Sequence, residues 1–313
     1  MEKKIDVIFL GTRGGLIEGN LTAYLLAPKG SDTFVCIDAG TLLSGLKQAN
    51  LVGSFNHINI PPDTPLTIEG YILKKCIKAY LLSHAHMDHI MGLAVNSMYD
   101  SQKSIVALPR TIDFLRDHIF NGISWPNLTN EGPEPCRNKY SYVRLELNKE
   151  TVLSEIPLGI TPFVVSHSNP YESTAFLIRF DNAYILFIGD TGPDPVEKSD
   201  KLQIIWAFVA PLVRKKMLRG IFIETSYCDG RPDHLLFGHL TPSWMMYELE
   251  RLAKFVDSKN PNKALAGLPV VVTSIKPTFD KISTKDQISV QLREQNNLAI
   301  DFILPEQGQL VDF

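Results

Sequence analysis

Apolar and polar residues along the chain follow two different spacings. Short apolar or alternating runs predict strands at residues 5–10, 21–27, 33–37, 77–82, 104–108, 140–146, 151–155, 160–166, 173–180, 184–188, 220–223, 270–274, 298–302 and 309–312. Apolar residues three and four positions apart predict helices at 42–50, from about 90 onwards, and at 109–120, 197–217, 241–256 and 285–296. Residues 53–70 and 121–139 are rich in Pro, Asn and Gly and predict long loops.

The order of these elements is strands, one helix, more strands and then more helices. This order suits an α/β (α+β) protein built as a four-layer αββα sandwich, with two sheets inside and helices outside. The periodicity alone establishes only a mixed α/β class. With 313 residues and 44% hydrophobic content, the chain can bury a full core. We expect one domain over residues 1–313, with a loop and helix insertion at about 109–139.

One stretch concentrates the side chains that bind metals. It runs Ser83-His-Ala-His-Met-Asp-His89 and follows the apolar strand at 77–82. His84 and His86 alternate along an extended backbone, so both can face one ion, whereas Asp88 and His89 lie past the bend and would suit a second ion. The alternative is a polar loop with incidental histidines, but the chain has only 8 histidines. The stretch therefore predicts a metal site.

Charge and cysteine content narrow the context in which such a site would work. The net charge of −3 gives no general attraction to nucleic acid or to an anionic membrane. The longest apolar stretch, 204–213, is too short to span a bilayer, and residues 1–10 do not resemble a secretory leader. The 4 cysteines are widely separated and form no CxxC pair. We expect a reduced, cytoplasmic protein with neither nucleic acid nor membrane as a partner.

Further ligands are expected where other predicted strands end. His167 follows the strand at 160–166, and Asp190 follows the most apolar strand, at 184–188. Asp190 could instead cap a helix. His239 lies in a loop just before the helix at 241–256, where a capping or core histidine competes with a catalytic one.

Several of these stretches together resemble the metallo-β-lactamase-fold superfamily, and within it the class II 3′,5′-cyclic-nucleotide phosphodiesterase family. The similarity covers nearly the whole chain. The histidine stretch is common to the superfamily, and the narrower match depends on Trp-Pro-Asn, Gly-Asp-Thr-Gly-Pro-Asp and Gly-His-Leu-Thr-Pro. The matching segments include Leu10-Gly-Thr-Arg-Gly-Gly15, Asp38-Ala-Gly40, His84 to Leu93, Trp125-Pro-Asn127, Gly189 to Asp194, Glu224-Thr-Ser-Tyr227, Gly238 to Pro242 and Ile275-Lys-Pro277.

The resemblance implies a centre of two divalent metal ions. His84, His86 and His167 would bind one ion, Asp88 and His89 the other, and Asp190 would bridge them. Zinc is the expected metal, with manganese or iron as alternatives. Ser274 stands where relatives of this kind carry a histidine. A hydroxyl is a poor zinc ligand, so the second site would be weaker, completed by water, or filled by a group such as His239.

The activity implied is hydrolysis of cyclic AMP, cyclic GMP or both to nucleoside 5′-monophosphates by metal-activated hydroxide. His239 is the candidate acid for the leaving O3′, and Asp88 or Asp190 could instead orient the water. Trp125 and Phe120 could stack on a base or could simply pack. The alternatives are a tRNA 3′-end-processing nuclease, another hydrolase of this fold that attacks carbon, or a metal-binding sensor of cyclic nucleotides. The expected partner is a small-molecule cyclic nucleotide, and a homodimer remains an open alternative.

Overall fold

The computed structural model describes residues 5–153 and 156–313. Residues 1–4 and the end of the strand predicted at 151–155, namely Ser154 and Glu155, lie outside the described residues. The chain divides into two compact units, described in turn below. Unit 1 comprises Met1–Thr12, Ile17–Gly159 and Glu306–Phe313, and unit 2 comprises Arg13–Leu16 and Ile160–Pro305.

Unit 1 is built on a mixed sheet with the strand order β14-β1-β2-β3-β4-β5-β6. Strands β14, β1, β2 and β3 pair antiparallel, whereas β3, β4, β5 and β6 run parallel. The parallel part needs crossover connections, and these carry the α-helices of the unit. The bounds are β1 Ile5–Gly11, β2 Ala23–Pro28, β3 Phe34–Ile37, β4 Ile77–Leu81, β5 Lys103–Ala107, β6 Tyr140–Arg144 and β14 Leu310–Asp312.

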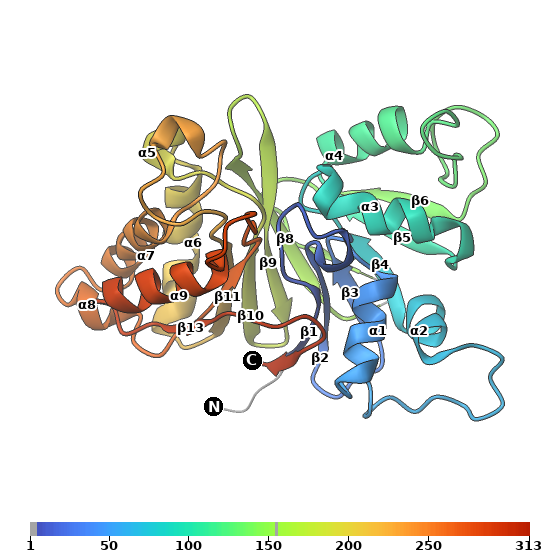
Figure 1. The fold of residues 1–313 in the computed structure, drawn as a ribbon, viewed down its shortest axis with the longest axis horizontal. Helices are drawn as coiled ribbons and strands as arrows, with labels where there is room; N and C mark the ends of the chain where they lie inside the picture. The colour runs from blue at the N-terminus through green and yellow to red at the C-terminus, as the bar shows by residue number, and fades with distance from the viewer. Residues whose placement is uncertain (1–4, 154–155) are drawn as a thin grey trace. The chain divides into compact units, whose positions relative to one another are not determined.

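The helices of unit 1 cover the sheet with apolar side chains such as Leu46, Ile90 and Ile112, which join one buried cluster with strand residues such as Leu25 and Tyr80. Figure 1 shows these helices, coloured blue to green, beside β3 to β6. Their bounds are η1 Glu18–Asn20, α1 Leu43–Leu51, α2 Ile68–Tyr71, η2 Ile72–Cys76, α3 Met87–Asn96, η3 Ser97–Tyr99, α4 Pro109–Phe114 and η4 Leu115–Ile119. The helix predicted from about residue 90 thus begins three residues earlier, at Met87.

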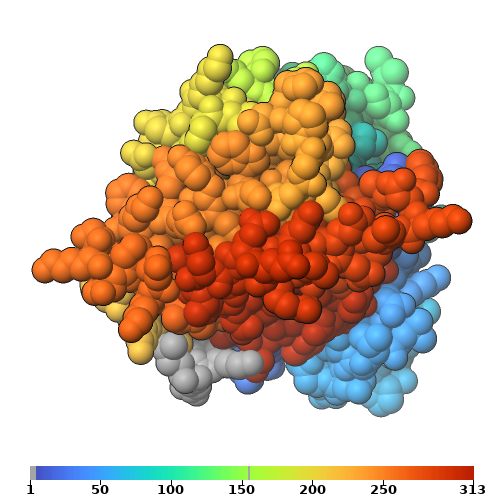
Figure 2. Space-filling model, turned by 60° about the vertical axis from the view of Figure 1, so that its left-hand side comes forward, coloured from blue at the N-terminus to red at the C-terminus, as the bar shows by residue number. Residues whose placement is uncertain are grey.

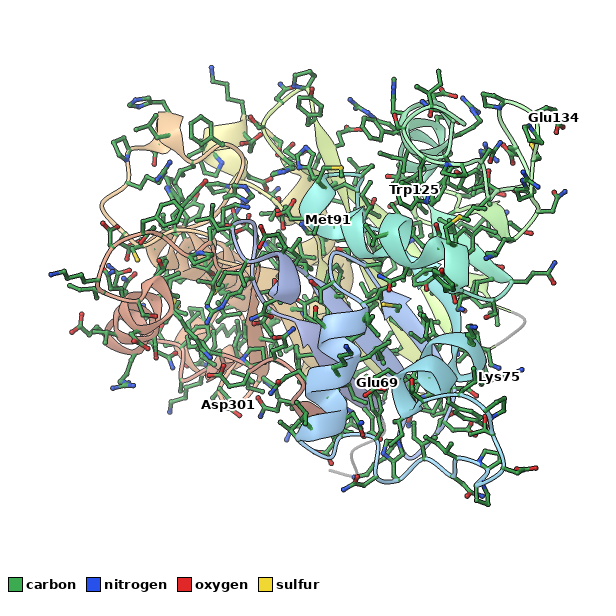
Figure 3. All side chains as sticks on the ribbon, turned by 45° about the vertical axis from the view of Figure 1, so that its right-hand side comes forward. Glu69, Lys75, Met91, Trp125, Glu134 and Asp301 are labelled. Atoms are coloured by element: carbon green, nitrogen blue, oxygen red, sulfur yellow. The ribbon has the colours of Figure 1, made fainter. Side chains whose placement is uncertain are left out.

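The predicted loop at 121–139 contains no helix or strand. Its Asn127 amide donates to the carbonyls of Glu131 and Pro133 and accepts from the backbone N–H of Thr129, so one buried side chain organises the loop. The indole N–H of Trp125, labelled in Figure 3, donates to Ser97 Oγ at 2.9 Å. Phe120 is fully buried. These aromatic residues therefore pack within unit 1, as the packing alternative predicted.

Unit 2 is built on β8 to β13 of the second sheet, whose strand order is β13-β12-β11-β10-β9-β8-β7. Strands β10, β11, β12 and β13 run parallel, and β9 pairs antiparallel with β10 through a two-residue turn at Asp181 and Asn182. The bounds are β7 Thr151–Val152, β8 Gly159–Ser166, β9 Glu172–Phe180, β10 Ala183–Ile188, β11 Leu218–Glu224, β12 Pro269–Thr273 and β13 Asp301–Ile303.

Helices α6, α7 and α9 of unit 2 bury apolar side chains such as Trp206, Leu249 and Ile288 in the core of the unit. Figure 2 shows the outward side of α7, α8 and α9, coloured orange to red. Their bounds are α5 Asp194–Glu197, α6 Lys201–Arg214, η5 Asp233–Leu235, α7 Pro242–Val256, α8 Pro261–Ala264 and α9 Thr284–Gln295. The helical stretch predicted at 197–217 is therefore wrong at both ends. Lys198 adopts a left-handed conformation with φ of 53° and separates α5 from α6, which ends at Arg214.

Two sheets flanked by helices confirm the predicted mixed α/β class. Among the described residues, none of the helices is both long enough and apolar enough to cross a membrane.

Candidate metal centre

The histidine stretch of unit 1 connects the end of β4 to the start of α3. The backbone bends at Ser83 and is extended at His86, and α3 then places Asp88 and His89 in its first turn. His84 and His89 are buried, whereas His86 is exposed. The ring centroids of His84 and His86 lie 4.6 Å apart, and those of His84 and His89 lie 4.2 Å apart. The three imidazoles thus form one group at this end of the sheet.

The fully buried carboxylate of Asp38 orients this group of histidines through hydrogen bonds. It follows β3 directly and accepts hydrogen bonds from the backbone N–H of Ser83 at 2.8 Å, from Ser83 Oγ at 2.8 Å and from His89 Nδ1 at 2.8 Å. Because the Ser83 hydroxyl donates to Asp38, it accepts from His84 Nδ1 at 3.0 Å. His84 and His89 therefore both carry their proton on Nδ1, which leaves the Nε2 lone pair for a ligand.

The segment from Asp38 to Gly40 lies directly against the first turns of α3. The backbone N–H of Ala39 donates to His89 O at 2.7 Å, and that of Gly92 donates to Gly40 O at 2.9 Å. A Cβ at Gly40 would overlap the carbonyl oxygen of Asp88, so only glycine permits this approach. The Asp-Ala-Gly sequence thus fixes the orienting carboxylate and the helix that carries two predicted ligands.

Unit 2 brings together three residues that are far apart in the sequence. His167 follows β8, Asp190 follows β10, and His239 lies in the loop before α7; each offers a ligand atom within 4.8 Å of those of the other two. All three are buried. The parallel strands β10, β11 and β12 end at the same edge of the sheet, and Asp190 follows β10 at that edge.

The caps proposed as alternatives for Asp190 and His239 do not occur. The N-cap of α5 is Pro193, and that of α7 is Thr241, whose side chain accepts from the N–H of Trp244. Neither Asp190 nor His239 therefore caps a helix.

His167 is held by the loop that contains His239. Its Nδ1 donates to Gly238 O at 2.9 Å, so its Nε2 also keeps a lone pair for a ligand. Burial lowers the pKa of His167 below its ordinary value, while the nearby Asp190 carboxylate opposes that shift. A lowered pKa keeps the imidazole neutral, which is the form that binds metals.

Glu224, the last residue of β11, orients a histidine in unit 2 as Asp38 does in unit 1. It is fully buried, and its Oε1 accepts from His239 Nδ1 at 2.7 Å. Its other oxygen accepts from the N–H of Ser226 at 2.9 Å and of Leu240 at 3.3 Å. His239 is thereby oriented so that Nε2 is the ring nitrogen available to a reacting group.

Ser274 follows β12, and its backbone carbonyl accepts from Ser226 Oγ at 3.0 Å. It is buried and has a φ of 52°. Ser226 Oγ also lies 3.2 Å from His239 Nδ1. Ser274 thus joins, through Ser226, the hydrogen-bond network of Glu224 and His239.

The loop after Asp190 is fixed by a buried ion network. Asp194 accepts from the N–H groups of Leu202 and Gln203 at the start of α6, and from Arg251 Nη1 at 2.9 Å. Glu248 accepts from the N–H of Asp194 at 3.1 Å and from Arg251 at 3.0 Å. Burial raises the pKa of Glu248, and Arg251 opposes the shift. This network connects α6 and α7 to the loop that carries Asp190.

Asp38 and Glu224 orient candidate site histidines, and the sequence patterns did not single them out. Both belong to segments that match the phosphodiesterase family, and both are carboxylates at the end of an apolar strand. That position was the available signal, because an acidic residue at the end of a buried strand needs a partner.

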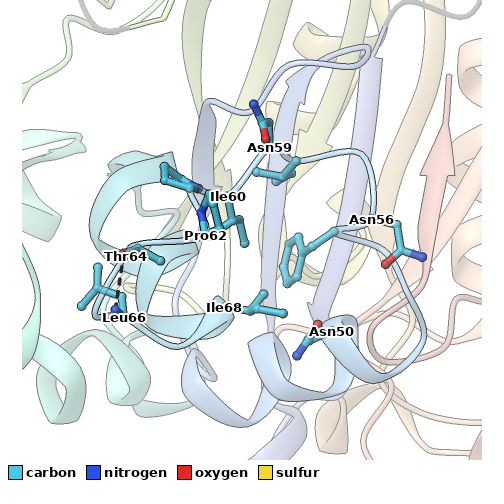
Figure 4. Close-up of a pocket in the computed structure, with 11 residues that line it drawn as sticks. Asn50, Asn56, Asn59, Ile60, Pro62, Thr64, Leu66 and Ile68 are labelled. Atoms are coloured by element: carbon cyan, nitrogen blue, oxygen red, sulfur yellow. Dashed lines mark hydrogen bonds between the residues drawn. The ribbon is translucent and has the colours of Figure 1, made fainter.

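A pocket of about 520 Å³ in unit 1 lies elsewhere on the unit, beside the loop between α1 and α2 (Figure 4). It offers neither an acidic nor a basic side chain, so it cannot supply acid–base chemistry. Its lining residues are Asn50, Phe55, Asn56, Ile58, Asn59, Ile60, Pro61, Pro62, Thr64, Leu66 and Ile68.

Comparison with known proteins identifies the family of the chain. A family model described as class-II cAMP phosphodiesterases matches residues 3–308. The chain belongs to this family. It is 39% identical over 310 residues to a 3′,5′-cyclic-nucleotide phosphodiesterase of Aliivibrio fischeri, covering 98% of this chain and 92% of the relative. It is 34% identical to 3′,5′-cyclic-nucleotide phosphodiesterase 1 of Saccharomyces cerevisiae, covering 94% and 95% of the two chains.

Solved structures confirm the fold predicted from the resemblance. The crystal structure of unliganded yeast PDE1 superimposes with a TM-score of 0.87 at 23% identity, covering 100% of both chains. The metallo-β-lactamase fold protein YhfI from Bacillus subtilis gives a TM-score of 0.62 at 15% identity, covering 99% of this chain and 100% of that one. The protein therefore has the metallo-β-lactamase fold.

Proposed function

We propose that this protein is a metal-dependent phosphodiesterase that hydrolyses 3′,5′-cyclic nucleotides to nucleoside 5′-monophosphates. The observation that carries the proposal is the cluster of His167, Asp190 and His239 in unit 2, in a chain of the class-II cAMP phosphodiesterase family. The imidazole of His167 and the carboxylate of Asp190 suit a divalent cation, and His239 lies beside them.

The residues fit a metal centre because their hydrogen-bond partners select one tautomer. The Nδ1 atoms of His84, His89 and His167 face a hydroxyl, a carboxylate and a carbonyl, so each Nε2 can bind a metal. We assign His84, His86 and His167 to one ion, Asp88 and His89 to a second, and Asp190 to both. Zinc suits these ligands, and manganese or iron are the alternatives.

Ions bound by these residues would lower the pKa of a bound water to about 7 and so supply the nucleophile. The protein's own part is to deliver a proton to the departing O3′. His239 Nε2 is the candidate donor, because Glu224 holds Nδ1 and turns the opposite edge of the ring towards the reaction. Asp88 or Asp190 could orient the water instead of, or in addition to, binding the ions.

We further propose that the substrate is a free cyclic nucleotide, cyclic AMP or cyclic GMP, rather than RNA, and that the enzyme acts in the cytoplasm. The net charge of −3 supports a small-molecule substrate, because RNA binding requires a basic surface. Neither nucleic acid nor a membrane is an expected partner, and a homodimer is the oligomer to test first.

The decisive experiment combines metal analysis with substrate comparison. The purified protein is analysed for zinc, manganese and iron and is assayed with cyclic AMP, cyclic GMP and a tRNA precursor. We expect about two metal ions per chain and turnover of at least one cyclic nucleotide that a chelator abolishes and added metal restores. Cleavage of the tRNA precursor without cyclic-nucleotide turnover would contradict the proposal, and so would tight nucleotide binding without turnover.

A further inference from the structure

Phe237 combines two unfavourable features. Its side chain is 55% exposed to solvent. Its backbone is left-handed, with φ of 51°, a conformation that is costly for a bulky residue. Such strain at an exposed aromatic residue persists only where the surroundings impose it, and it concentrates at functional sites.

The surroundings that impose it belong to the candidate metal centre of unit 2. The next residue, Gly238, accepts from His167 Nδ1, and a Cβ at Gly238 would overlap the backbone nitrogen of Ser168. The N–H of His239 donates to Leu236 O at 3.1 Å, closing a tight turn around Phe237. Phe237 is thus held immediately beside a predicted metal ligand and the predicted proton donor.

Arg231 extends this aromatic surface. Its guanidinium carbon lies 3.9 Å from the ring centroid of Tyr227 and 5.8 Å from that of Phe237. Its Nε donates to Leu235 O at 2.6 Å, which fixes the plane of the guanidinium. Tyr227 in turn has its ring centroid 5.6 Å from that of His239. A planar cation and two aromatic rings therefore continue outward from His239.

We propose that Phe237 is the stacking surface for the nucleobase of the cyclic nucleotide, and that Arg231 holds this surface in place. The inference rests on the proposed function, since it names the binding residue for part of that substrate. Aromatic rings and guanidinium planes both stack on the flat face of a base. A surface fixed beside His239 is placed to bind the base while the phosphate lies at the metal centre. Trp125 and Phe120, which are packed within unit 1, are not needed for this role.

The test is the Phe237→Ala variant, assayed with metal-loaded protein on cyclic AMP and cyclic GMP. We expect KM to rise about 5- to 150-fold, the range for loss of one base–aromatic stack, with kcat changed less than threefold. Phe237→Tyr should restore KM to within about threefold of the original protein. A KM unchanged in Phe237→Ala, or a loss confined to kcat, would overturn the inference.

A substrate without a base supplies an independent check. On a methyl riboside 3′,5′-cyclic phosphate, the original protein and Phe237→Ala should have the same kcat/KM, because there is no base to stack. Phe208→Ala is the matched control, since Phe208 on α6 is similarly exposed, at 48%, and packs on Phe163. It should leave KM for cyclic nucleotides unchanged. Equal losses on both substrates would show that Phe237 supports the site rather than the base.

Phe237→Gly keeps the inference testable if the alanine variant fails to fold. Glycine adopts the left-handed backbone without steric cost, so its thermal midpoint should not fall below that of the original protein. Its KM should still rise as in Phe237→Ala. An original protein that turns over no cyclic nucleotide would defeat the proposed function itself, whereas an active protein with unchanged KM in these variants would defeat only the inference about Phe237.

Discussion

Each of the two units orients a histidine with one fully buried carboxylate. Asp38 follows β3 and accepts from His89 Nδ1 at 2.8 Å, and Glu224 ends β11 and accepts from His239 Nδ1 at 2.7 Å. Each carboxylate also accepts backbone N–H groups of the adjoining loop. In both units, a charge at a strand end sets the tautomer and the angle of an imidazole.

The units differ in what surrounds the oriented histidine. In unit 1 the predicted ligands come from one short loop and the first turn of α3, so Asp38 can orient two of them at once, one through Ser83. In unit 2 the residues come from separate loops, and a buried ion network is needed to hold the loop after Asp190. We therefore expect that a substitution of Asp38 changes metal affinity, whereas a substitution of Glu224 changes proton transfer by His239.

The largest effect on catalysis is expected from His239→Ala. Removing a general acid costs about 10²- to 10⁴-fold in kcat, and metal content should stay unchanged if His239 is only the proton donor. Steady-state kinetics on cyclic AMP with metal analysis of the same sample check this. Loss of metal together with activity would instead show that His239 is a metal ligand. It would then fill the second metal site, where Ser274 replaces the histidine of relatives.

The ion network of unit 2 should make the largest contribution to stability. Arg251→Met leaves the carboxylates of Asp194 and Glu248 without their cation and should cost about 3 kcal/mol, the low end for a broken buried pair since Arg251 keeps some exposure. Urea unfolding measures the loss. The control is Lys254→Met on the same helix. Lys254 is exposed, so its substitution should change the unfolding free energy little.

The stability loss of Arg251→Met should depend on pH, with a sign that the contacts of Glu248 determine. Burial raises the folded-state pKa of Glu248, and removing Arg251 removes a group that lowers it. A raised folded-state pKa gives stability that is present below the unfolded pKa and is lost as pH rises through the folded one. The difference in unfolding free energy between Arg251→Met and the original protein should therefore be smaller at pH 4 than at pH 8. A difference independent of pH would contradict this role of Glu248.

Substitution of the two orienting carboxylates should have a smaller effect. It tests directly whether Asp38 and Glu224 have different roles. Asp38→Asn should weaken metal binding about 10- to 100-fold, as for other groups that orient metal ligands. Glu224→Gln should lower kcat while metal affinity changes little. Competition with a chromophoric chelator measures affinity. Weakened metal binding in Glu224→Gln, with none in Asp38→Asn, would reverse the assignment.

The smallest effect is expected from Ser83→Ala. It removes the hydroxyl between Asp38 and His84 but leaves the direct contact of Asp38 with His89. Metal affinity should fall by less than in Asp38→Asn, by about threefold, if one of two oriented ligands is released. A loss as large as that of Asp38→Asn would show that Asp38 acts mainly through Ser83.

The sequence by itself determined the local structure around the histidine stretch, because strand, loop and helix there are contiguous and each signal is local. It also identified the family and fold class through motifs spread along the chain. Most element positions followed from periodicity, but the break at Lys198 and the end of α6 at Arg214 did not. A left-handed residue other than glycine gives no local signal at Lys198, and Met217 and Leu218 continue the apolar spacing past Arg214.

Only the tertiary structure decided which carboxylates orient which histidines. Asp38 and His89 are 51 residues apart, and Glu224 and His239 meet because a strand end and a loop before α7 lie side by side in unit 2. Hydrogen bonds of this kind depend on distances between segments, which no local pattern encodes. The same holds for Phe237, whose exposure and left-handed backbone become visible only once Gly238 is seen against His167 and Ser168.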